Sequence, residues 1–160
     1  MKYNQNYDLS VIVPFFKRIE FGQLILKELD KECHNLNIKI ELIFVDSKSV
    51  PDLYSRLTEY KLKSGLEIKV LNTKNNLSKK RNFGIINANS ENIICIDDDC
   101  IPDNNFIKSH LKALNKIGND KIILSGKVCF PKNLSTKSNF HRFRNERHRA
   151  YDINYIGKKN

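Results

Sequence analysis

Residues 92–99 read NIICIDDD, an apolar run that stops at three consecutive aspartates. A short continuous apolar run predicts a buried strand, so the aspartates are expected at its carboxyl end. Neighbouring carboxylates about 6 Å apart repel by roughly 3 kcal/mol at an effective dielectric of 20. We therefore expect a cation to compensate them. The alternative is that one aspartate caps the next helix and that solvent covers the others.

Two earlier stretches show the same pattern of an expected strand followed by a residue of possible function. Residues 9–13 end at Pro14, and residues 38–45 end at Asp46. Amphipathic helical segments separate the expected strands, which also include 66–71 and 121–130. Strands that alternate with helices predict an α/β fold with a Rossmann-like, mostly parallel sheet flanked by helices. Ligands of such sheets bind beyond the carboxyl ends of the strands. Pro14, Asp46 and the aspartates at 97–99 are expected to meet there.

The chain has 160 residues, which is enough for one compact domain. We expect an α/β ligand-binding domain over residues 1–131 and a basic tail, partly ordered or helical, over 132–160. The tail carries 8 basic and 2 acidic residues, so it supplies +6 of the net charge of +10. This asymmetry indicates an anionic partner, which could be nucleic acid, a phosphorylated small molecule or an anionic lipid.

Aspartate oxygens at 97–99 suit Mg²⁺ or Mn²⁺, which usually bind a few carboxylates and bridge to substrate phosphates. The sequence contains neither the glycine-rich dinucleotide fingerprint nor a P-loop. Phosphates, if bound, must then be held by metal and by basic side chains such as Lys79, Lys80 and Arg81. The simpler expectation for the two lysines is a solvated helix start.

Three segments together resemble a known family: LSVIVPFFKR at 9–18, ELIFVDSKS at 41–49 and LSKKRNFGIINANSENIICIDDDCIPD at 77–103. They resemble, in order and spacing, the nucleotide-binding half of family-two glycosyltransferases with the A-type fold. The resemblance covers residues 9–130. It implies inverting, metal-dependent sugar transfer from a nucleotide diphosphate sugar, most simply a UDP-sugar. The acceptor would be a glycan or lipid-linked molecule in glycan or polysaccharide synthesis.

The resemblance also assigns the nucleotide-sugar contacts residue by residue. Pro14 and Phe15, in the loop after the first strand, are expected at the nucleotide. Asp46 is expected to contact the base, although the family's usual acid and glycine after it are absent here. Arg81 and Asn82, in the third helix, are expected against the donor.

The acidic run matches the D-x-D motif of the family. The resemblance implies that Asp97 faces the ribose or the metal, that Asp98 lies at the donor and that Asp99 ligates the metal directly. The expected cofactor is Mn²⁺ or Mg²⁺.

A general base is not found in the sequence. Family members supply it from an acceptor-binding half, often within an E-D pair, and after Asp103 the acids are Asp120, Glu146 and Asp152. We therefore expect an apparently truncated fold that binds donor with little or no turnover. The catalytic residue stays unknown.

Two other functions remain open from the residues alone. The strand followed by Asp97-x-Asp99 also resembles the nucleophile motif of haloacid dehalogenase-like phosphatases, with Asp97 attacking phosphorus. Alternatively, arginines and aromatic residues in the tail could bind nucleic acid. The glycosyltransferase interpretation expects no nucleic acid.

Residues 138–151 read SNFHRFRNERHRAY and permit a basic amphipathic helix. Such a helix can contact an anionic membrane surface. The start of the chain does not resemble a secretion signal, so we expect a cytoplasmic protein with an option of peripheral membrane contact.

Overall fold

The computed structural model describes residues 7–117, 123 and 126–148. Backbone contacts divide the chain into two units, residues 1–116 and residues 117–160, and each unit is described by itself.

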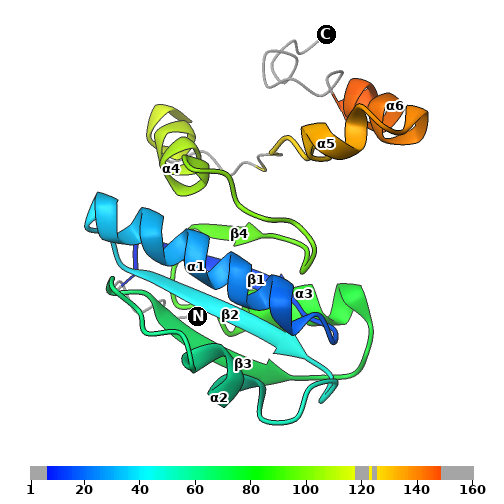
Figure 1. Ribbon diagram of the computed structural model, residues 1–160. Coiled ribbons are helices and arrows are strands. Elements are labelled where there is room, and N and C mark those ends of the chain that lie inside the picture. The colour runs from blue at the N-terminus through cyan, green and yellow to red at the C-terminus, as the bar shows by residue number, and fades with distance from the viewer. Residues whose placement is uncertain (1–6, 118–122, 124–125, 149–160) are drawn as a thin grey trace, which may run out of the picture. The chain divides into compact units, whose positions relative to one another are not determined.

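The first unit is a parallel sheet with helices on both faces (Figure 1). Its four strands lie in the order β3-β2-β1-β4, and every neighbouring pair is parallel. Each strand is followed by a helix, as the sequence pattern predicted. The strands are β1 (Leu9–Pro14), β2 (Ile40–Asp46), β3 (Glu67–Asn72) and β4 (Ile93–Cys95). The helices are α1 (Ile19–Leu36), α2 (Leu53–Thr58), α3 (Leu77–Ile86) and α4 (Phe106–Ile117).

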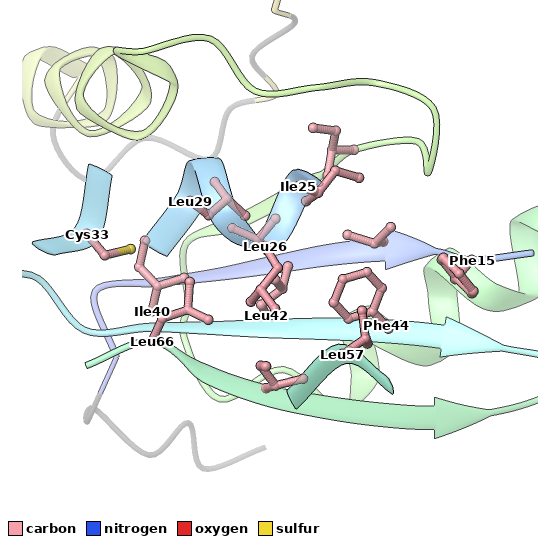
Figure 2. Packing of buried hydrophobic residues seen from close by; sticks show 14 of the residues in the cluster. Phe15, Ile25, Leu26, Leu29, Cys33, Ile40, Leu42, Phe44, Leu57 and Leu66 are labelled. Atoms are coloured by element: carbon pink, nitrogen blue, oxygen red, sulfur yellow. The ribbon is translucent and has the colours of Figure 1, made fainter. Parts of the chain in front are cut away.

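Strands β1 and β2 are buried along their whole length, because helices cover the sheet on both sides. On one face, Leu26 and Leu29 of α1 pack with Leu42 and Phe44 of β2 (Figure 2). On the other face, Ile12 of β1 belongs to a smaller cluster beside α3. This two-sided burial explains why the strands appear in the sequence as continuous apolar runs.

The fifth strand expected over 121–130 is not found in the described residues of that range, which are 123 and 126–130. The other positions lie outside the described residues. At Phe130, the side chain of Asn145 takes both backbone groups. Its Oδ1 accepts from the Phe130 N–H at 2.7 Å, and its Nδ2 donates to the Phe130 carbonyl at 3.2 Å. The strand prediction for 126–130 is therefore wrong, and at Phe130 a side chain replaces the strand partner.

The second unit contains α5 (Lys132–Ser135) and α6 (Asn139–His148). Helix α6 lies within the stretch 138–151, where the sequence permits a helix, and residues 149–151 lie outside the described part. Phe140 and Phe143 are 63% and 58% exposed, so their rings are not covered by this unit. Among the described residues, no helix has the length and apolar character needed to span a membrane.

Buried acids hold the loops of the first unit in place. Glu41 of β2 accepts hydrogen bonds from the Ser10 hydroxyl at 2.5 Å and from the Asn89 side-chain amide at 2.9 Å. These bonds fix the loop between α3 and β4. Glu32 of α1 accepts from the backbone N–H of Ile107 at 3.0 Å, so a carboxylate occupies the positive end of α4. Both acids fix the chain on either side of the aspartate run.

Asp30 of α1 is fully buried and holds the loop between α2 and β3. Its carboxylate accepts from the Ser64 N–H at 2.9 Å, the Ser64 hydroxyl at 2.6 Å and the Tyr60 hydroxyl at 3.1 Å. Burial by itself raises the pKa of Asp30, but hydrogen bonds from Ser64, Lys63 and Tyr60 outweigh it and hold the pKa below its usual range.

Replacement of Asp30 by asparagine (Asp30→Asn) is expected to lower the free energy of unfolding by about 1–3 kcal/mol near neutral pH, since an amide NH₂ cannot accept these bonds. A carboxyl whose folded pKa is depressed stabilises fully above its unfolded pKa of about 3.9 and loses this contribution as the pH falls through the folded value. The gap between wild type and Asp30→Asn in urea unfolding should therefore shrink on acidification. The exposed Asp52→Asn variant is the control, and a gap that widens in acid would contradict the assignment.

Gly84 lets α3 approach the sheet closely. A Cβ atom at this position would lie 2.5 Å from Cγ2 of Ile12 and 3.2 Å from Cγ2 of Val45. Both neighbours are β-branched side chains within the buried strands. The glycine that weakens the helical pattern in the sequence is therefore required by packing.

A Gly84→Ala substitution is expected to destabilise the protein by about 1–3 kcal/mol through overpacking, although alanine normally improves a helix interior by about 0.5–1 kcal/mol. The matched control is Gly65→Ala, because a Cβ there meets no atom within 4 Å. Chemical denaturation of both variants decides the point. Equal stability of the two variants would disprove the close approach of α3.

Candidate functional site

The loops after β1, β2 and β4 leave the sheet at the same edge, since all strands are parallel (Figure 1). The acidic run at 97–99 follows β4. This strand lies at the border of the sheet and pairs with the inner strand β1. Helix α3 brings its first turns to the same edge, where Arg81 pairs with Asp97. Side chains from three separate stretches of sequence therefore meet as the parallel topology predicted.

Asp98 points inward, toward the loop after β1. Its side chain is 11% exposed. One carboxylate oxygen accepts from the backbone N–H of Phe16 at 2.8 Å, and the other accepts from Nη1 of Arg18 at 2.9 Å. The middle aspartate therefore joins the loop after β4 to the loop after β1.

Asp97 and Asp99 are about half exposed, at 49% and 52% of their side chains. Asp97 forms an ion pair with Arg81, and Asp99 forms one with Arg18 at 2.7 Å. The carboxylate of Asp98 is the main cause that raises the pKa of Arg18; burial opposes it, and the carboxylate of Asp99 adds to the rise. Two arginines thus balance three aspartates, and the outer two acids remain accessible.

Asp46, at the end of β2, is 1% exposed. Its carboxylate accepts from the Ser49 N–H at 2.7 Å and from the Ser49 hydroxyl at 2.6 Å. The Ser49 hydroxyl oxygen in turn accepts from the backbone N–H of Lys17 at 2.9 Å. Asp46 therefore folds its own loop and links that loop to the one after β1. Its contact with a nucleotide base stays a prediction.

The two aromatic residues after Pro14 lie in different surroundings. Pro14 and Phe15 are buried, and the ring of Phe15 packs edge-on against Phe44 with centroids 5.7 Å apart (Figure 2). Phe16 is 39% exposed, and the ammonium groups of Lys17 and Lys80 lie 5.1 and 5.2 Å from its ring centre. Phe16, which the sequence reasoning did not select, offers the accessible ring of this loop.

Lys80 is the least expected residue of the site. It is 2% exposed, and its ammonium donates to the Phe15 carbonyl at 2.6 Å and to Asn75 Oδ1 at 3.1 Å. Burial lowers the pKa of Lys80, while the nearby carboxylates of Asp46 and Asp98 act in the opposite direction.

The expected solvated helix start is correct for the exposed Lys79 but wrong for Lys80. One signal in the sequence could have found it, because Lys80, Gly84 and Ala88 recur every four residues and face the sheet together. Asn82, by contrast, lies on the exposed side of α3.

The chemistry of the donor set fits a divalent ion bound together with phosphates. Among the described residues, no three His, Cys, Asp or Glu side chains are grouped closely enough to enclose a metal ion by themselves. Mg²⁺ commonly takes only one or two carboxylates, with phosphate and water oxygens completing its shell. The accessible oxygens of Asp97 and Asp99 match that requirement.

Two shallow surface hollows lie elsewhere in the first unit. One, of about 460 Å³, lies between α1 and α4, and the other, of about 510 Å³, lies between α1 and the end of α2. Neither includes a residue of the strand-end loops described above. We therefore place the candidate site at the charged sheet edge, where the chemistry is, and not in the hollows.

Comparison with protein families adds a match over almost the whole chain. Residues 10–159 match the family described as Glycosyl transferase family 2. This chain belongs to glycosyltransferase family 2. A search among curated proteins gave no match.

Solved structures of TarS from S. aureus share the fold of this family-two chain. TarS 1–349 is 19% identical with a TM-score of 0.54, and the match covers 74% of this chain and 39% of that one. TarS 1–349 in complex with UDP-GlcNAc gives the same identity and TM-score, over 74% of this chain and 37% of TarS. The longer TarS structure is 22% identical with a TM-score of 0.53, over 68% and 19% of the two chains.

At these identities the likeness establishes the A-type glycosyltransferase fold. The chain spans less than two fifths of the length of each of these TarS structures. Family membership favours the glycosyltransferase interpretation over the dehalogenase-like and nucleic-acid-binding alternatives.

Lys80→Met is expected to destabilise the protein by about 1–3 kcal/mol, because the Phe15 carbonyl and Asn75 lose a charged donor. The matched control is Lys79→Met on the exposed side of the same helix, for which little change is expected. Thermal unfolding of the two variants compares them directly. If Lys79→Met were the more damaging, the burial of Lys80 would be refuted.

Proposed function

We propose that this family-two chain binds a nucleotide diphosphate sugar at the charged sheet edge, with a divalent ion held by Asp97 and Asp99. The observation that carries the proposal is the meeting of three aspartates and two arginines beyond parallel strands. A UDP-sugar is the first candidate, since similar TarS structures were solved with UDP-GlcNAc and with UDP.

Each side chain at this edge has a proposed task. Asp97 and Asp99 present carboxylate oxygens, and the ion they hold, Mn²⁺ or Mg²⁺, would stabilise the diphosphate that leaves during transfer. Arg81 is near enough to Asp97 to donate to the same diphosphate. Phe16 offers an exposed ring for stacking on the base.

The other residues predicted from the sequence are mostly buried, and their proposed task is to support the loops of the site. Pro14, Phe15 and Asp46 are proposed to hold the loops that meet the nucleotide, and Asp98 to position Phe16 through its backbone N–H. Asn82 lies exposed one residue beyond Arg81, where a side-chain amide can reach the donor.

Sugar transfer with inversion also needs a carboxylate that takes the proton of the acceptor hydroxyl. After Asp103, Glu146 is the acid that falls within the described residues, and it belongs to the second unit. We therefore expect donor binding with little or no transfer by this chain alone. The acceptor, a glycan or a lipid-linked molecule, belongs to the proposal and not to the findings.

The second unit supports a further part of the proposal. Helix α6 carries Arg142 and Arg144 as well as the exposed rings of Phe140 and Phe143. Cations next to apolar rings suit the surface of an anionic membrane. We propose a cytoplasmic protein that contacts such a membrane peripherally.

A thermal-shift experiment with UDP-, GDP- and CMP-sugars tests donor binding. A UDP-sugar with Mn²⁺ is expected to raise the melting temperature, since a ligand at 100 times its dissociation constant stabilises by about 2.7 kcal/mol. Removal of the metal by EDTA, or Asp99→Asn, should abolish the shift. The control is Asp52→Asn, an exposed acid at the start of α2, which should keep it. An unchanged melting temperature with every sugar would refute the proposal.

A further inference from the structure

Arg18 shares one nitrogen between two of the three aspartates. It is the residue before α1, and its Nη1 lies 2.9 Å from Oδ1 of Asp98 and 2.7 Å from Oδ2 of Asp99. Neither composition nor motif singled out this arginine. Its position between the two carboxylates is a property of the folded chain.

The two partners of Arg18 differ in how firmly they are held. The Asp98 side chain is 11% exposed, and its second oxygen is bound to the Phe16 N–H. The Asp99 side chain is 52% exposed, and its second oxygen has only the weak thiol donor of Cys100 at 3.8 Å. Exposed ion pairs contribute little, about 0–1 kcal/mol. The contact with Asp99 is therefore the one that can be exchanged cheaply.

A divalent ion at Asp99 would compete with Arg18. Nη1 lies 2.7 Å from this carboxylate, so a cation bound to Asp99 would be repelled by the positive guanidinium beside it. If Asp99 changes partner, Arg18 keeps its contact with Asp98 and stays beside the ion. Both of its contacts with the aspartates use Nη1, so the other N–H groups of the guanidinium can donate to a phosphate, a ligand that such groups bind well.

We propose that Arg18 is an exchangeable counterion: it occupies Asp99 while no donor is bound, and it donates to the diphosphate of the donor once Asp99 holds the ion. This inference rests on the proposed function of the same site. It predicts opposite effects of removing Arg18. Binding of the ion alone becomes tighter because a competitor is lost, and binding of the nucleotide in the presence of the ion becomes weaker because a phosphate contact is lost.

The test measures the two affinities separately in Arg18→Gln. Titration of the full chain with Mn²⁺ alone, followed by the electron paramagnetic resonance of free Mn²⁺, should show binding up to about fivefold tighter than wild type. Calorimetric titration with UDP at saturating Mn²⁺ should show binding about tenfold weaker. The control is Arg56→Gln, an exposed arginine of α2, which should leave both affinities unchanged.

Arg18→Lys provides a second variant in case Arg18→Gln folds poorly. Its ammonium keeps the charge but lacks the further N–H groups of the guanidinium that could reach a phosphate, so the same two changes are expected at smaller size. If both affinities fall together, or neither changes in a folded variant, Arg18 has only a structural role and the inference is overturned. If wild type itself binds neither Mn²⁺ nor UDP, the proposed function fails and the inference fails with it.

Discussion

One buried carboxylate, that of Asp98, holds together the edge of the sheet where the candidate site lies. It bonds to the Phe16 N–H and to Arg18, so the loop after β4 and the loop after β1 cannot move independently. A carboxylate removed from water needs such partners, because an unpaired buried charge is costly. Lys80 of α3 also holds the loop after β1 in place, since its buried ammonium donates to the carbonyl of Phe15. The geometry of the site is a consequence of satisfying these two inner charges.

The charges at this edge divide into an inner and an outer set. Asp98 and Lys80 are buried and build the loops, whereas Asp97 and Asp99 are half exposed and bind arginines that solvent can reach. Exposed pairs are weak and exchangeable, and buried ones resist disruption. This division allows ligands to come and go at the outer acids while the backbone beneath them stays in place. In the sequence the three aspartates are simply adjacent, and the fold shows that the middle one is buried.

The strands were predictable because burial on both faces leaves a continuous apolar run, and the parallel order then placed Pro14, Asp46 and the aspartates at one edge. The family resemblance added Arg81, which the structure brings to Asp97. Arg18 and Phe16 were missed, and Lys80 was expected in solvent, since their roles depend on contacts with residues 65, 80 and 82 positions away or on exposure within a loop. The strand expected at 126–130 is not formed there, and at Phe130 the side chain of Asn145, 15 residues away, bonds to both backbone groups. Local pattern predicts elements well, and tertiary contacts decide which polar side chain turns inward.

Strand β4 has only three residues and pairs with β1 alone among the described strands. Short strands at the border of a sheet open at lower free energy than the centre, and their amide hydrogens exchange sooner with solvent. The aspartates follow this strand, so the part of the sheet that carries the acidic residues is a border, which is less protected than the centre. A ligand that links Asp97 or Asp99 to the neighbouring loops would therefore slow amide exchange more in β4 than in the fully buried centre of the sheet.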